Sequence, residues 1–262
     1  MRLFVLVCTL VIVSGCRYGF DFAGADGDPA AGDPLDDDAG TTADALSPGS
    51  DAPGGGPDAG PRPFCDPTNP DLVGCYQFEN SAADGSSAGN DLTTNDGSFV
   101  TGQRGMALYT ANGGALAPED SSMQVPQLTL EVWVRPDSTP VPTGPRMGII
   151  DKDNEYSIFL YENDEIRCGG GTLTPAFYPL PLGEWTHLAC TNDGSSLSIF
   201  IDGELVNSLP ATPPDTDGTE GWGVGMNSPS GDLFDGAIDD LRIWRIARSP
   251  ADICAAAAPA CP

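Results

Sequence analysis

The feature that most constrains the fold is a succession of short apolar segments in residues 65–262, which are separated by Gly, Pro, Asn and Asp. We expect strands at Val73–Glu79, Leu128–Arg135, Tyr156–Tyr161, Thr186–Thr191, Leu197–Ile201 and Ile238–Trp244. Leu128, Leu130, Val132 and Val134 alternate along one segment, so they share a face of their strand. Many short strands with almost no helical period predict an all-β fold, a two-sheet antiparallel sandwich.

Two local signals refine this prediction. Asp202-Gly203 stands between Leu197–Ile201 and Glu204–Val206, and such a pair favours a two-residue hairpin turn. Ser249-Pro250 predicts the start of a short helix, because Ser caps helices and Pro suits the first helical position.

Residues 1–15 have the composition of an export signal. Arg2 precedes the apolar run Leu3–Val13, which is too short to span a bilayer, and no later segment is longer. Val13–Cys16 (Val-Ser-Gly-Cys) resembles the lipobox of bacterial lipoproteins, in which the cysteine becomes the new N-terminus and carries acyl chains. This resemblance implies a lipid anchor on Cys16 in the bacterial outer membrane, on its periplasmic or cell-surface face; Arg17 in place of an Asp favours the outer membrane. The alternative is an ordinary signal peptide that ends near a cysteine.

Residues 16–64 form the expected tether between the anchor and the domain. Residues 17–64 contain ten Asp and no Glu or Lys, and they are rich in Gly, Pro and Ala. Such a segment buries too little apolar surface to offset its ordering entropy, and as a flexible coil it reaches roughly 40 Å. The net charge of −27 argues against nucleic acid as a partner.

Six cysteines remain after Cys8 leaves with the signal and Cys16 takes lipid. An even number in an exported chain is typical of disulfides, and six cysteines allow fifteen connectivities. We favour Cys168–Cys190, because their strands could be neighbours, with Cys65–Cys75 and Cys254–Cys261 as the local choices. The alternative for these four is a pair of bridges that joins the two ends of the domain.

Several segments, in order, resemble the laminin-G-like (LamG), concanavalin A-like jelly rolls. The matching segments are Asp84–Asn90, Gln127–Pro136, Gly183–Ala189, Leu197–Glu204 and Phe234–Trp244. The resemblance runs from about Leu72 to Ala247 and implies two packed sheets with the first and last strands adjacent. Members of this superfamily include lectins, adhesion modules, spacers and glycan hydrolases.

The resemblance also suggests a structural calcium ion near the first and last strands. By alternation with Leu241 and Ile243, Asp239 should point into the core, where a carboxylate needs a partner. Asp84 and Asn90 would complete an oxygen ligand set. The alternative is an Asp239 that accepts backbone N–H groups at a strand end.

Catalytic residues are not predicted. His187 is the single histidine, and a structural histidine is favoured. Glycan hydrolases on this fold carry an E-x-D-x-x-E strand, whereas Leu130–Arg135 offers only Glu131. We therefore expect no enzyme activity and no catalytic cofactor.

Aromatic residues near variable connections are the candidate ligand contacts, namely Trp222, Tyr156 and Tyr178, with core packing as the alternative for each. Trp133 is expected to pack. The prediction is a monomeric, membrane-anchored lipoprotein that displays a non-catalytic module for a glycan or a surface protein. The alternatives are a structural spacer in an envelope assembly and, less favoured, a polysaccharide-acting hydrolase.

Overall fold

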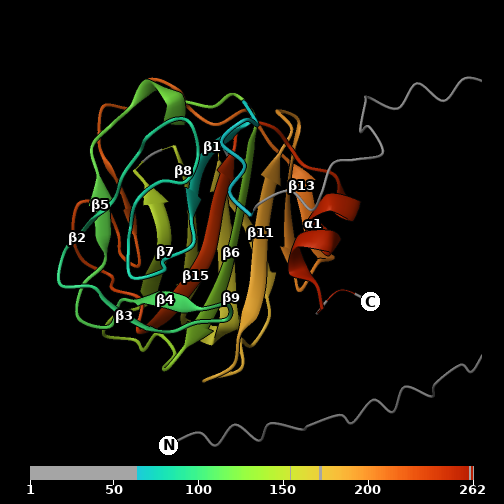
Figure 1. Cartoon of the computed structure of the whole chain (residues 1–262). Helices are drawn as coiled ribbons and strands as arrows, with labels where there is room; N and C mark the ends of the chain where they lie inside the picture. Colours follow the sequence, from blue (N-terminus) through green and yellow to red (C-terminus); the bar gives the residue numbers. More distant parts are fainter. Residues whose placement is uncertain (1–63, 154, 171–172, 260, 262) are drawn as a thin grey trace, which may run out of the picture. The chain divides into compact units, whose positions relative to one another are not determined.

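The computed structural model describes residues 64–153, 155–170, 173–259 and 261. These residues form two antiparallel β-sheets packed face to face, with a short helix, α1, beside the larger sheet (Figure 1). The sandwich prediction is thereby confirmed. The expected signal peptide, Cys16 and nearly all of the tether lie outside the described residues.

The larger sheet has eight strands, and its two longest strands lie next to each other at its centre. Its order is β13 (Glu204–Pro210), β12 (Ser196–Ile201), β11 (Thr186–Asn192), β6 (Leu128–Pro136), β15 (Gly236–Trp244), β4 (Met106–Tyr109) and β3 (Ser98–Thr101). The eighth strand, β1 (Leu72–Tyr76), pairs with the second half of β15, and β4 pairs with its first half. The first and last strands are therefore adjacent, as the family resemblance implied.

The smaller sheet has seven strands. Its order is β10 (Leu173–Phe177), β9 (Glu165–Gly170), β8 (Tyr156–Tyr161), β7 (Arg146–Lys152), β14 (Trp222–Val224), β5 (Ala115–Ala117) and β2 (Thr93–Thr94). Two 3₁₀ turns, η1 (Ser121–Met123) and η2 (Glu162–Asp164), lie in connections.

The local predictions agree with the structure except at some strand ends. β12 and β13 form the expected hairpin, and the turn residues Asp202 and Gly203 both have positive φ (50° and 83°), as a type I′ turn requires. The first strand is shorter than predicted and ends at Tyr76, because Phe78 has a φ of 53° and leaves the extended conformation.

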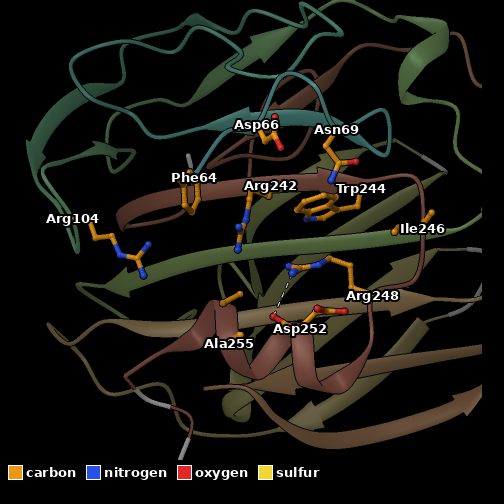
Figure 2. Close-up of a pocket in the computed structure, with 11 residues that line it drawn as sticks. Phe64, Asp66, Asn69, Arg104, Arg242, Trp244, Ile246, Arg248, Asp252 and Ala255 are labelled. Carbon is orange, nitrogen blue, oxygen red and sulfur yellow. Dashed lines mark hydrogen bonds between the residues drawn. The ribbon is translucent and has the colours of Figure 1, made fainter. Parts of the chain in front are cut away.

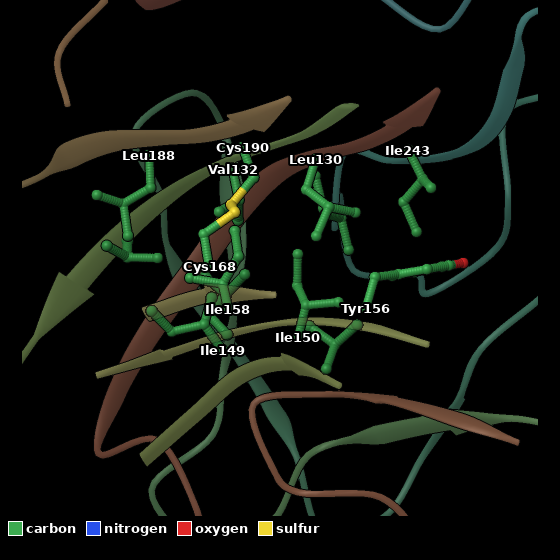
Figure 3. Packing of buried hydrophobic residues seen from close by; sticks show 14 of the residues in the cluster. Leu130, Val132, Ile149, Ile150, Tyr156, Ile158, Cys168, Leu188, Cys190 and Ile243 are labelled. Carbon is green, nitrogen blue, oxygen red and sulfur yellow. A yellow bond between two sulfur atoms is a disulfide. The ribbon is translucent and has the colours of Figure 1, made fainter. Parts of the chain in front are cut away.

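The core lies between the two sheets. Leu130 and Val132 of β6 face Ile150 and Ile158 of the smaller sheet, and all four are at most 1% exposed (Figure 3). Burial of each such side chain stabilises the fold by about 1.5–3 kcal/mol.

A disulfide crosses this core. Cys168 on β9 and Cys190 on β11 are bridged with Cα atoms 6.1 Å apart (Figure 3). The pair is the one favoured from the sequence, but its strands belong to opposite sheets and are not neighbours in one sheet. The bridge therefore ties the two layers together.

The other two bridges are local, Cys65–Cys75 (Cα atoms 5.7 Å apart) and Cys254–Cys261 (5.2 Å). The first fixes the segment that enters β1. The second closes the end of α1.

Helix α1 (Pro250–Ala257) covers part of the outer face of the larger sheet (Figure 1). Ser249 caps it through the N–H of Asp252, and Pro250 occupies its first turn, as predicted. Ile253 packs against Ala189 and Phe200 on the sheet. Within the part of the chain that the structure describes, no helix is long and apolar enough to cross a membrane.

Candidate functional site

A bulge in β15 decides which side chains reach the outer face of the larger sheet. Asp240 has a φ of 50°, and the pairing register between β15 and β6 shifts between Asp239 and Arg242. Ile238 and Leu241 both point into the core. Because a bulge adds one residue, Asp239 pairs with Trp133 on the outer side of the sheet. The prediction that Asp239 points into the core is therefore wrong.

Asp239 is nonetheless buried, under the loop that holds Arg104. Its carboxylate accepts the backbone N–H groups of Arg104 (3.0 Å) and Asp240 (2.8 Å). Burial raises the pKa of Asp239 to about 7, and the adjacent Asp240 adds to the increase. This is the arrangement that we gave as the alternative to a calcium ligand.

The other two expected calcium ligands form a separate local network. The Asp84 carboxylate accepts the backbone N–H groups of Cys75, Ser86 and Asn90, and the Asn90 amide donates to the carbonyl of Val73. The oxygens of Asp84 and Asp239 thus accept N–H groups from different segments of the chain. Across residues 64–261, masked gaps apart, no group of three His, Cys, Asp or Glu could hold a metal ion. Calcium binding stays a prediction.

Glu131 organises the outer face. Its side chain is fully buried, and its Oε2 atom accepts Arg242 Nη2 (2.8 Å) and Trp244 Nε1 (3.3 Å). Its Oε1 atom pairs with Arg248 Nη1. One carboxylate thus holds two guanidinium groups in fixed positions, and a fully paired carboxylate of this kind serves as a structural anchor.

The guanidinium groups alternate with aromatic rings. Arg242 Cζ lies 4.5 Å from the Phe64 ring centroid and 5.8 Å from that of Trp244. Arg248 Cζ lies 4.7 Å from the Trp244 centroid. Stacking of this kind fixes the direction in which the remaining guanidinium N–H groups point.

A pocket of about 700 Å³ opens above this stack, between residues 64–69 and α1 (Figure 2). Its lining residues are Phe64, Asp66, Asn69, Arg104, Arg242, Trp244, Ile246, Arg248, Asp252, Ala255 and Ala256. Figure 2 shows Asp66 and Asn69 on one wall, Asp252 and Ala255 on the opposite wall, and Arg242 with Trp244 between them. We call this the outer-face pocket.

The lining suits a polyhydroxylated ligand. Guanidinium groups donate hydrogen bonds, carboxylates accept them, and aromatic and alanine surfaces contact apolar patches of a sugar ring. A cavity of this size also falls in the range of ligand sites in proteins.

The predicted aromatic contacts lie elsewhere. Trp222 is fully buried against Tyr76, and Tyr156 is 2% exposed with its hydroxyl donating to the carbonyl of Met123. Tyr178 is partly buried against the same core. Trp222 and Tyr156 are therefore packing residues, because their alternating positions on β14 and β8 turn them inward, and the expectation that they contact ligand is wrong.

His187 and Trp133 are paired on the neighbouring strands β11 and β6, and their rings pack against each other. Their ring centroids are 5.3 Å apart, and both side chains are almost fully buried. Burial lowers the pKa of His187 to about 3, with a further decrease from Arg242, Arg248 and Arg104. His187 is therefore neutral at physiological pH, and its ring contributes packing contacts with Trp133.

The sequence reasoning did not single out the arginines of the pocket. A signal was present, because Arg242, Arg245 and Arg248 are three of only 11 basic residues and lie within one short stretch. The meeting of Arg242 and Arg248 with Phe64 and Arg104 depends on the sheet topology, which brings distant segments to one face.

The fold and site define a jelly-roll sandwich with a ligand-sized pocket on one outer face. Residues 110–254, more than half of the chain, match the family model described as the concanavalin A-like lectin/glucanases superfamily. The chain belongs to this superfamily. A search of curated proteins found no match.

Solved structures share the fold. Domain 4 of AbnA, an extracellular arabinanase from Geobacillus stearothermophilus in complex with arabinotriose, has a TM-score of 0.60 at 23% identity, over 71% of this chain and 98% of the domain. The binding domain of botulinum neurotoxin DC in complex with SialylT has a TM-score of 0.53 at 12% identity, over 76% of this chain and 52% of that chain. The sialidase of Trypanosoma rangeli has a TM-score of 0.53 at 17% identity, over 71% of this chain but only 32% of the sialidase. The fold is therefore shared by binding domains and by enzymes.

Proposed function

We propose that this chain is a membrane-anchored, non-catalytic lipoprotein that binds a glycan in its outer-face pocket. The observation that carries the proposal is the pocket itself, where paired arginines, aromatic rings and carboxylates surround a space of about 700 Å³. The arabinotriose bound to a domain of the same fold, and the SialylT bound to another, support a saccharide as the ligand class.

The anchoring part of the proposal rests on the sequence. The Val13–Cys16 motif supplies a lipidation site, and the acidic segment behind it supplies reach from a membrane. The three disulfides of the domain suit an oxidising compartment outside the cytoplasm.

The non-catalytic part rests on the state of Glu131. A general acid or nucleophile needs an oxygen that can reach the substrate. Both Glu131 oxygens are instead buried and paired with Arg242, Arg248 and Trp244. The one carboxylate that a hydrolase could use on this strand is thus occupied by ion pairs and a hydrogen bond that hold the fold together.

A glycan array with the full chain carrying Cys16→Ser, which removes the lipidation site, tests the proposal. We expect binding to a defined set of glycans and no release of sugar from them. Ala255→Trp fills the pocket from the exposed face of α1 and should abolish binding. Ala251→Trp adds the same side chain to an exposed position of the helix outside the pocket and should leave binding intact. No binding to any glycan, or equal binding by both variants, would overturn the proposal.

A further inference from the structure

The outer-face pocket carries an imbalance of charge on its floor. Arg242 and Arg248 share the buried carboxylate of Glu131, and Arg104 pairs with Asp240, which also attracts Arg242, so three guanidinium groups face two carboxylates. Burial lowers the pKa of Arg242, and the nearby Arg248 and Arg104 lower it further, while Glu131 and Asp240 act in the opposite direction. An anion placed there would balance the third guanidinium group.

Arg242 also has an unused donor. Its Nε atom is buried and has no hydrogen-bond partner among the described residues. A buried donor without a partner is costly, and a guanidinium presents its N–H groups in a fork that fits a carboxylate. Because Arg242 also lines the pocket, its guanidinium is the position beside which we place the acidic group of a ligand.

Arg104 stands beside this position at the mouth of the pocket. Its side chain is 51% exposed and lies 3.4 Å from the Asp240 carboxylate. Its Cζ atom is 6.0 Å from the Phe64 ring, the same ring on which Arg242 stacks. Figure 2 shows Arg104 and Arg242 on either side of Phe64. A carboxylate between them would meet two guanidinium groups.

The two acidic residues of the lining do not occupy this position. Asp66 accepts hydrogen bonds from Thr68 N (2.9 Å) and Oγ1 (2.6 Å), and Asp252 accepts one from Ser249 Oγ (2.6 Å). They stand on the opposite walls of the pocket, whereas Arg242 lies between the walls (Figure 2). On its wall, Asp252 is placed to accept a hydroxyl group of a sugar.

We propose that the ligand of this pocket is a glycan bearing a carboxylate, such as a uronic or sialic acid, with that carboxylate held between Arg104 and Arg242. This inference rests on the proposed function and narrows it. The net charge of −27 repels densely charged polymers, so the pocket selects a single acidic sugar within a glycan and not a polyanion.

The test compares acidic oligosaccharides, containing glucuronic, galacturonic, mannuronic or sialic acid, with their carboxyl-reduced counterparts by calorimetry, using the full chain with Cys16→Ser. We expect at least one acidic oligosaccharide to bind. Its carboxyl-reduced form should have an affinity that is lower by at least about tenfold. Arg104→Gln should weaken binding of the acidic form about tenfold and leave the reduced form unchanged. Arg245→Gln, which removes an exposed arginine outside the pocket, should change neither.

The outcomes separate the two proposals. If acidic and reduced forms bind equally, or if only neutral glycans bind, the carboxylate inference is overturned while glycan binding stands. If Arg104→Gln and Arg245→Gln have the same effect, the placement of the carboxylate is wrong. If no glycan binds, the proposed function fails together with the inference.

Discussion

Glu131→Gln is the perturbation whose cost follows most directly from the structure. The substitution keeps the size of the side chain and removes its charge. It leaves Arg242 and Arg248, whose side chains are 13% and 16% exposed, facing each other without a carboxylate. Breaking a buried ion pair by removing one partner costs about 3–5 kcal/mol.

This cost should appear in the free energy of unfolding measured by urea denaturation. A loss of about 3–5 kcal/mol in a domain of this size corresponds to a decrease in melting temperature of roughly 10 °C. The control is Glu204→Gln, an exposed glutamate on β13, which should change the free energy of unfolding by less than about 0.5 kcal/mol.

A double variant sharpens the test. Arg248→Gln added to Glu131→Gln removes one of the two guanidiniums that the first change left unpaired. The double variant should therefore be more stable than the sum of the single effects predicts, by about 0.5–3 kcal/mol. If Glu131→Gln costs less than about 1 kcal/mol, or if the two changes are additive, Glu131 is not the electrostatic anchor of this face.

Three further predictions concern pH, metal and anchoring. Burial raises the pKa of Asp151 to about 6, with Asp153 and Asp232 adding to the increase, whereas an unfolded Asp titrates at about 3.9. Folding then takes up a proton between about pH 4 and 6, so the contribution of Asp151 to the free energy of unfolding falls as the pH rises through this window. Asp151→Asn should flatten this part of the plot of unfolding free energy against pH. Asp215→Asn, at an exposed position, should leave the plot unchanged. A structural calcium ion at Asp239 predicts that a chelator lowers the melting temperature and that Asp239→Ala removes this sensitivity, whereas equal melting temperatures in calcium and in a chelator would refute the calcium site. Cys16→Ser should move the protein from the membrane fraction to the soluble fraction, and a variant that stays with the membrane would refute the lipid anchor.

The strands were largely predictable because apolar and polar residues alternate along them, and the apolar positions mark the face that packs in the core. Leu128, Leu130, Val132 and Val134 all point into the core, as their spacing predicts. The cap at Ser249 was predictable for a similar reason, since a cap depends on neighbouring residues only.

The site was less predictable because it depends on a bulge and on topology. The bulge at Asp240 reverses the side of the sheet to which Asp239 points. An Asp-Asp pair in the sequence does not predict the positive φ of Asp240 that forms this bulge. The segment at Phe64, the loop at Arg104 and helix α1 meet only because β15 pairs with β1, β4 and β6. No local pattern encodes that meeting.

The structure of a bound oligosaccharide tests the central claim most directly. Crystals of the Cys16→Ser chain, grown with the strongest glycan from the array, should show the sugar in the outer-face pocket, between residues 64–69 and α1, in contact with Arg242 and Arg104. A sugar bound on the outer face of the seven-stranded sheet, with the outer-face pocket filled by solvent alone, would contradict it.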